Sequence, residues 1–80
     1  MKLPRDISGN DLAVRLEKYG YRVTRQTGSH MRLSTDVKGK HHITIPKHEF
    51  LSVGTLSAIL RDVAGHLEMD KRELIKEIQD

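Results

Sequence analysis

The residues best suited to chemistry in this sequence are a histidine and the polar side chains that follow it at alternate positions. His30 comes directly after a Gly-Ser pair, and Arg32 and Ser34 follow at a spacing of two residues. Because side chains alternate across a β-strand, His30, Arg32 and Ser34 are predicted to share one face of a strand. The apolar Met31 and Leu33 then occupy the other face. Histidine transfers protons near neutral pH and arginine binds anions, so the polar face could act on an anionic substrate.

Gly28 and Ser29 stand immediately before His30 and are typical of a tight turn between two strands. Backbone amides at such a turn can also bind a phosphate group. One glycine and one serine do not make up a phosphate-binding loop, however. We therefore interpret the pair as a hairpin turn that places His30 at the head of a strand.

Three further histidines lie nearby, at positions 41, 42 and 48. His42 is predicted to share the face of His30, either as a second proton-transfer group or, as we favour, in a structural role between strands. His41 is expected on the apolar side at the sheet edge, and His48 in a loop. These histidines lack the i, i+4 spacing of a helical metal site, and Glu49 is the one carboxylate near them at a spacing suited to a ligand. We therefore expect no functional metal site.

The middle of the chain is basic although the net charge is only +3. Residues 20–48 contain six basic side chains and one acidic side chain, Asp36, whereas residues 61–80 contain four basic and six acidic side chains. A basic centre that also carries four of the five histidines suits a polyanion. Chance clustering of charge is the alternative. The six basic residues are Arg22, Arg25, Arg32, Lys38, Lys40 and Lys47.

Length and composition predict one small domain over residues 1–80. A chain of this size buries about 60% of its unfolded surface on folding, so a partner could add to its stability. The sequence contains no cysteine, which fits a reducing compartment. Its apolar runs are short, so we expect no signal peptide, no membrane span and a cytoplasmic location.

The helices are predicted from caps and apolar spacing. A first helix is expected over residues 9–19, because Ser8 and Asp11 have the spacing of a capping box and Gly20 provides a left-handed stop. A second helix is expected to end at Gly65, and Asp70 begins a third, short helix. The apolar stripe of the second helix consists of Leu56, Ile59, Leu60 and Val63.

Between the first two helices the apolar period changes to two, which predicts three strands joined by turns at residues 27–29 and 36–40. Val23 is expected in the core, and Arg25, which breaks the alternation, at the sheet edge. The expected fold is α+β, with order α-β-β-β-α, a three-stranded antiparallel sheet, helices on one face and a short C-terminal helix. The polar face is expected to carry Arg22, Thr24, His30, Arg32, Ser34, His42 and Thr44.

This order of elements resembles the double-stranded-RNA-binding fold. Several ordered motifs also resemble the HicA toxins of bacterial and archaeal toxin–antitoxin modules, in register from Leu3 to about Gly65. The motifs are residues 3–9 (LPRDISG), 20–30 (GYRVTRQTGSH), 42–48 (HITIPKH) and 54–60 (GTLSAIL). The whole chain is accordingly interpreted as a single HicA-like domain.

The resemblance implies an mRNA interferase, an endoribonuclease that cleaves mRNA without the ribosome and is held inactive by a HicB-type antitoxin. The catalytic histidine of the family's Gly-Ser-His motif corresponds to His30, and the glycine corresponds to Gly28, a turn residue. Single-stranded RNA would be the substrate, and we expect no metal, no other cofactor and no membrane. Charge and the predicted faces suggest as RNA-binding residues Arg22, Arg32, Lys38, Lys40 and His42.

RNA cleavage through the 2′-hydroxyl needs a base for that hydroxyl, an acid for the leaving 5′-oxygen and cations that stabilise the developing charge. His30 could fill either proton role, and Arg32 could hold the phosphate, with Arg22 as a weaker candidate. Two other classes of function stay open. A module of this fold could bind RNA without cutting it, and the polar sheet face could instead bind only another protein.

Overall fold

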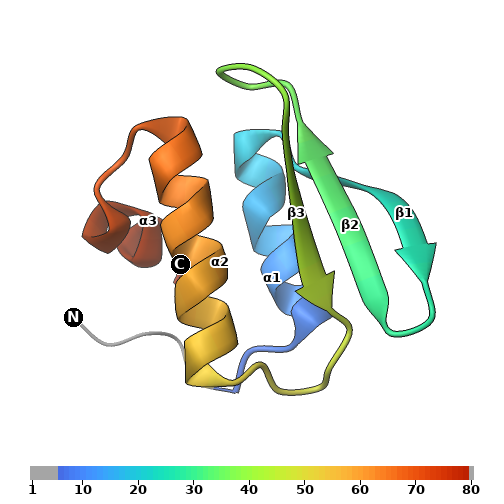
Figure 1. Cartoon of the computed structure of the whole chain (residues 1–80). Helices are drawn as coiled ribbons and strands as arrows, with labels where there is room; N and C mark the ends of the chain where they lie inside the picture. The colour runs from blue at the N-terminus through green and yellow to red at the C-terminus, as the bar shows by residue number, and fades with distance from the viewer. Residues whose placement is uncertain (1–5, 80) are drawn as a thin grey trace.

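The chain runs from a helix through three strands to two further helices, in the order expected from the sequence (Figure 1). The computed structural model describes residues 6–79, so the start of the 3–9 motif and residue 80 lie outside the described residues. The elements are α1 (Gly9–Arg15), the 3₁₀ helix η1 (Leu16–Tyr19), β1 (Arg22–Thr27), β2 (His30–Thr35), β3 (His41–Pro46), α2 (Val53–Leu67) and α3 (Lys71–Ile78).

The three strands form an antiparallel meander with β2 in the centre. Helices α1 and α2 lie against the same side of the sheet, and α3 lies beyond α2, away from the strands (Figure 1). The other face of the sheet carries no helix of the described chain. The predicted α+β architecture, with helices on one face and a short C-terminal helix, is confirmed.

The helices begin where the sequence places their caps. The Ser8 hydroxyl accepts a hydrogen bond from the Asp11 backbone N–H at 3.0 Å, and the Asp11 carboxylate accepts one from the Ser8 N–H at 3.4 Å. This capping box satisfies two N–H groups that the first turn of a helix leaves without partners. Ser52 and Asp70 cap α2 and α3 through their own side-chain oxygens.

The core lies between the apolar face of the sheet and the two helices that cover it. Met31 and Leu33 of β2 and Ile43 and Ile45 of β3 are buried there, as their alternation predicts. Burying each such side chain stabilises the fold by about 1.5–3 kcal/mol. Because side chains alternate along a strand, burial of these four residues leaves the residues between them on the face away from the helices. The helical side of the core contains Leu12, Leu16, Leu56, Ile59, Leu60 and Val63.

Two details of the predicted elements are wrong. Val23 is 47% exposed rather than buried, because β1 is an edge strand and its register shifts between Val23 and Arg25. Helix α2 does not end at Gly65 but continues to Leu67, which is buried. Its last turn closes on Glu68, whose φ of 57° lies in the left-handed region that a glycine usually occupies at a helix end.

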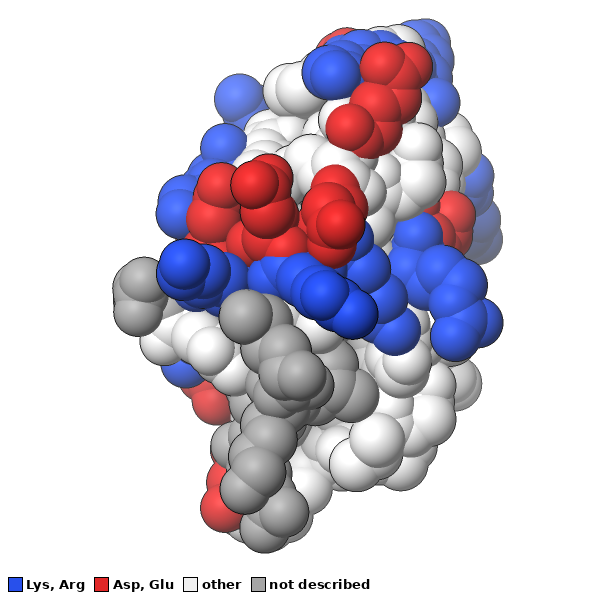
Figure 2. Space-filling view, turned by 90° about the vertical axis from the view of Figure 1, so that its left-hand side faces the viewer, with Lys and Arg blue, Asp and Glu red and all other residues white. Residues whose placement is uncertain are grey.

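Helix α3 is attached to the remainder of the fold by apolar and polar contacts. Leu74, Ile75 and Ile78 are buried on one of its faces. The Lys71 ammonium donates to the Ser57 hydroxyl at 2.6 Å, and the Tyr19 hydroxyl donates to the Glu77 carboxylate. Figure 2 shows the side of the molecule on which α3 lies, where acidic and basic side chains are interspersed. No helix within residues 6–79 has the length and apolar character needed to cross a membrane.

Candidate functional site

His30 is the first residue of β2 and follows directly on the two-residue turn formed by Gly28 and Ser29. Gly28 has a φ of 53°, a conformation that L side chains rarely adopt, which explains the glycine at this tight turn. The Ser29 carbonyl accepts a hydrogen bond of 2.6 Å from the Lys47 backbone N–H, so the segment after β3 is tied to the turn. His30 is therefore held at one end of the sheet by backbone contacts, while its side chain is exposed.

The register of the sheet decides which polar side chains can meet His30. Across the β2–β3 pair, His30 is opposite Pro46 and Ser34 is opposite His42. His42 therefore lies four residues along the strand from His30, which at about 3.3 Å per residue is about 13 Å. Arg32 is only two residues away on the same face. Of these two candidates, Arg32 is the one that can share a phosphate with His30.

Sequence reasoning missed Arg25. The register shift in β1 is a β-bulge, and it places Arg25 directly opposite Arg32 instead of on the apolar side. Arg25 lines a groove on the polar face together with Arg32. A charged residue at an apolar position of an alternating strand is itself the signal that could have indicated the bulge.

This groove has a volume of about 430 Å³ and runs across all three strands. Three of the residues predicted to bind RNA, Arg32, Lys40 and His42, line it together with Arg25. Its one carboxylate among the described residues is that of Asp36. The other lining residues are Thr24, Ser34 and Thr35.

The remaining predicted residues lie outside the groove. Arg22 lines an adjacent hollow that also includes Thr24 and Ser34. Lys38 instead approaches the Glu68 carboxylate at 3.7 Å, next to the end of α2. His30 lies at the end of β2 away from His42, so the groove and His30 occupy different parts of one face.

Hydrogen bonds connect the hydroxyl groups of the groove to His42. The Ser34 hydroxyl lies 2.6 Å from His42 Nδ1 and 3.0 Å from the Thr24 hydroxyl. The Thr24 hydroxyl donates in turn to the Arg32 carbonyl oxygen at 3.3 Å. These contacts link all three strands and hold the His42 ring through one nitrogen.

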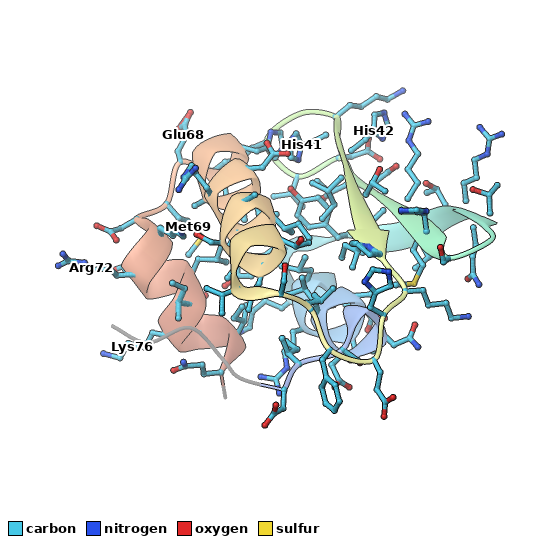
Figure 3. All side chains as sticks on the ribbon, turned by 60° about the horizontal axis from the view of Figure 1, so that its bottom comes forward. His41, His42, Glu68, Met69, Arg72 and Lys76 are labelled. Atoms are coloured by element: carbon cyan, nitrogen blue, oxygen red, sulfur yellow. The ribbon has the colours of Figure 1, made fainter. Side chains whose placement is uncertain are left out.

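His41 points to the opposite side of β3 from His42, toward α2 (Figure 3). Its Nδ1 lies 2.7 Å from the Tyr21 hydroxyl, its Nε2 lies 3.1 Å from the Asp62 carboxylate, and its ring stacks on His66 at 4.3 Å. Burial, followed by the charge of Asp62, raises the pKa of Tyr21 to about 12. His41 is thus half-buried and has partners on α2 and on Tyr21, the residue before β1, which gives it a structural role away from the polar face.

Among the described residues, no carboxylate forms an ion pair with the cations of the groove. Within residues 6–79 the two ion pairs are Lys38 with Glu68 and His41 with Asp62. Like charges directly opposite each other destabilise a sheet, so the facing Arg25 and Arg32 are unfavourable for folding by themselves. An anion placed between them would remove that repulsion. No group of three metal-ligating side chains from His, Cys, Asp and Glu comes together in this part of the chain.

Comparison with known proteins identifies the family. A search of the curated proteins and a search of the solved structures each give no match. A family model described as the HicA toxin of bacterial toxin–antitoxin systems matches residues 9–64, from the start of α1 into α2, and so covers more than half of the chain. The chain therefore belongs to the HicA toxin family.

Proposed function

We propose that this toxin is an endoribonuclease that cleaves mRNA without the ribosome, with His30 as its catalytic residue. The observation that supports this proposal most strongly is the position of His30, exposed at the end of an uncovered sheet face on which Arg32 is the next polar side chain. Proton transfer and phosphate binding are thereby available at neighbouring points. A messenger RNA substrate implies that the toxin acts in the cytoplasm.

The proposed reaction uses the 2′-hydroxyl of the RNA as the nucleophile. The 2′-oxygen loses its proton to a base and forms a bond to the adjacent phosphorus, and the bond from phosphorus to the 5′-oxygen breaks as that oxygen takes up a proton. His30 carries one of these protons, and the Arg32 guanidinium stabilises the charge that develops on the phosphate oxygens. The products are a 2′,3′-cyclic phosphate and a 5′-hydroxyl. This chemistry is intrinsic to RNA and needs no metal ion.

The proposed partner is a HicB-type antitoxin. To stop cleavage it must cover His30 or place acidic groups against the cations of the same face.

RNA binding without cleavage is the second candidate function, because the groove with Arg25, Arg32 and Lys40 does not include His30.

One experiment separates the two candidates. The purified toxin, His30→Ala and His48→Ala are each incubated with an end-labelled single-stranded RNA in excess EDTA, and the ends of the products are identified. His48 is the matched control, because it is also exposed and lies after β3 outside the groove. We expect cyclic-phosphate products from the wild type and His48→Ala and none from His30→Ala. Uncut RNA that all three proteins bind would instead identify an RNA-binding module.

A further inference from the structure

We propose that the groove formed by Arg25, Lys40 and His42 is a second phosphate-binding subsite for the RNA strand, separate from the phosphate that is cleaved at His30. The subsite extends the proposed function, because it assumes that the chain held on this face is RNA. Its ligand is the phosphodiester backbone of a single strand.

The distance between His42 and His30 supports a separate subsite. The two histidines lie about 13 Å apart along the sheet, by the register of β2 and β3. Neighbouring phosphates on one strand are separated by at least about 3.4 Å along the strand axis, so this distance corresponds to at most about four nucleotides. One RNA strand of moderate length can therefore contact both points, whereas a dinucleotide, with a single phosphate, cannot.

The charges of the groove support an anionic ligand. Arg25 and Lys40 are exposed, neither takes part in the ion pairs found within residues 6–79, and Arg25 faces the like charge of Arg32. Asp36 opposes them as a single carboxylate. A phosphate bound by Arg25 and Lys40 would gain charge-assisted hydrogen bonds and offset the repulsion between Arg25 and Arg32, while Arg32 itself contacts the phosphate at His30.

The contacts of His42 support a fixed geometry for that ligand. Ser34 holds Nδ1 at 2.6 Å and is itself in contact with Thr24. Because the Thr24 hydroxyl donates its one proton to the Arg32 carbonyl, Ser34 donates to Thr24 and accepts from His42 Nδ1–H. The imidazolium form of His42 then has a second N–H, at Nε2, which can donate to a phosphate oxygen. Ser34 is therefore a positioning residue, and His42 is the group that contacts the phosphate.

The test measures binding and cleavage separately. Binding is measured by fluorescence anisotropy with a labelled 2′-O-methyl octanucleotide, which has no free 2′-hydroxyl and stays intact. We expect Arg25→Ala, Lys40→Ala and His42→Ala each to weaken binding about tenfold. The slope of log affinity against log salt should become shallower by about 0.7 for each cation removed. Lys76→Ala, on the exposed face of α3, is the matched control and should bind like the wild type.

Ser34 provides the test of positioning. Ser34→Ala should weaken octanucleotide binding, and Ser34→Thr, which keeps the hydroxyl, should restore it.

Cleavage of an unmodified octanucleotide should show a raised KM and an unchanged kcat in Lys40→Ala, while cleavage of a dinucleotide should not change at all.

These experiments distinguish an error in the proposed subsite from an error in the proposed ribonuclease activity. Wild-type protein that cuts no RNA but shows the expected binding losses would overturn the cleavage and keep the subsite. Octanucleotide affinity that is unchanged in all three groove variants would overturn the subsite whether or not RNA is cut. An equal loss on the dinucleotide and the octanucleotide would also overturn it, because the groove would then act through the site at His30.

Discussion

Gly9 shows how one residue determines the position of the segment next to His30. A Cβ atom built at Gly9 would lie 2.0 Å from the carbonyl oxygen of Pro46, the residue paired with His30 across the sheet. The Gly9 N–H also donates to the His48 carbonyl at 2.9 Å. The start of α1 thus packs directly on the backbone that follows β3, and only a residue without a side chain fits there.

We predict that Gly9→Ala lowers the free energy of unfolding by about 1–3 kcal/mol, because the backbone of one segment must move to admit the methyl group. The matched control is Gly65→Ala in α2, where a Cβ meets open space and should raise stability by up to about 1 kcal/mol through helix propensity. Urea denaturation of both variants provides the measurement. A stable Gly9→Ala protein would show that α1 and the end of β3 can separate without cost.

Tyr21 gives a prediction about pH. Its pKa of about 12 in the folded protein lies above the value of about 10 for an unperturbed tyrosine. Between these values the folded state keeps a proton that the unfolded state releases, so the contribution of Tyr21 to stability is complete below about pH 10 and declines as the pH rises to about 12. The pKa of Tyr19 is raised as well, by burial and then by its hydrogen bond to Glu77, and acts in the same direction.

We therefore expect the free energy of unfolding, measured with urea at pH 8 and pH 11, to fall less in Tyr21→Phe than in the wild type. The variant should be less stable than the wild type at pH 8, because His41 loses its hydroxyl partner. Comparing the two proteins removes the effect of lysines that titrate in the same range. An identical decline in both would contradict a raised Tyr21 pKa.

For single residues, the sequence predicts the face of a strand on which a side chain lies wherever polar and apolar residues alternate regularly. His30, Arg32 and Ser34 are on one face of β2, as their spacing requires. Arg25 could not be placed in the same way, because a bulge adds a residue to one strand and reverses the side on which the following residues lie. The contacts of His41 with Tyr21, Asp62 and His66 join residues far apart in sequence, and no local pattern predicts them.

At the scale of elements, α3 lies wholly outside the segment matched by the family model. Helix α3 contributes to the hydrophobic core, because its Leu74 is fully buried there. We predict that Leu74→Ala lowers the free energy of unfolding by about 2–5 kcal/mol, a large fraction of the stability of a small domain. Lys76→Ala on the exposed face should change it by less than about 0.5 kcal/mol.

Chemical denaturation of the two α3 variants at neutral pH decides this prediction. A small effect of Leu74→Ala, comparable to that of Lys76→Ala, would mean that α3 contributes little to the core.

The sequence signals were sufficient to predict α3, since Asp70 caps the helix as predicted. The end of α2 was mispredicted because Gly65 is a common stop, although Leu67 continues the apolar spacing of Val63 by four residues and could have indicated the longer helix.

At the scale of the whole molecule, charge is distributed differently on two sides. The uncovered face of the sheet presents Arg25, Arg32 and Lys40 without carboxylate partners among the described ion pairs. The side formed by α3 carries acidic and basic groups together (Figure 2). Helix α3 itself contains Arg72, Glu73, Lys76 and Glu77. Long-range attraction of a polyanion is therefore directed at the sheet and away from the helices.

This asymmetry predicts where the antitoxin binds. An antitoxin that blocks RNA must compete for the sheet face, so its contact surface should be acidic. We expect Arg25→Glu combined with Lys40→Glu to weaken antitoxin binding at least about tenfold, because like charges then face each other across the interface. The matched control is Arg72→Glu combined with Lys76→Glu on α3, which makes the same change in net charge on the other side. Isothermal titration calorimetry with the proposed HicB-type antitoxin measures both. If the α3 variant loses affinity and the sheet variant does not, the antitoxin binds the helical side and must inhibit without covering His30.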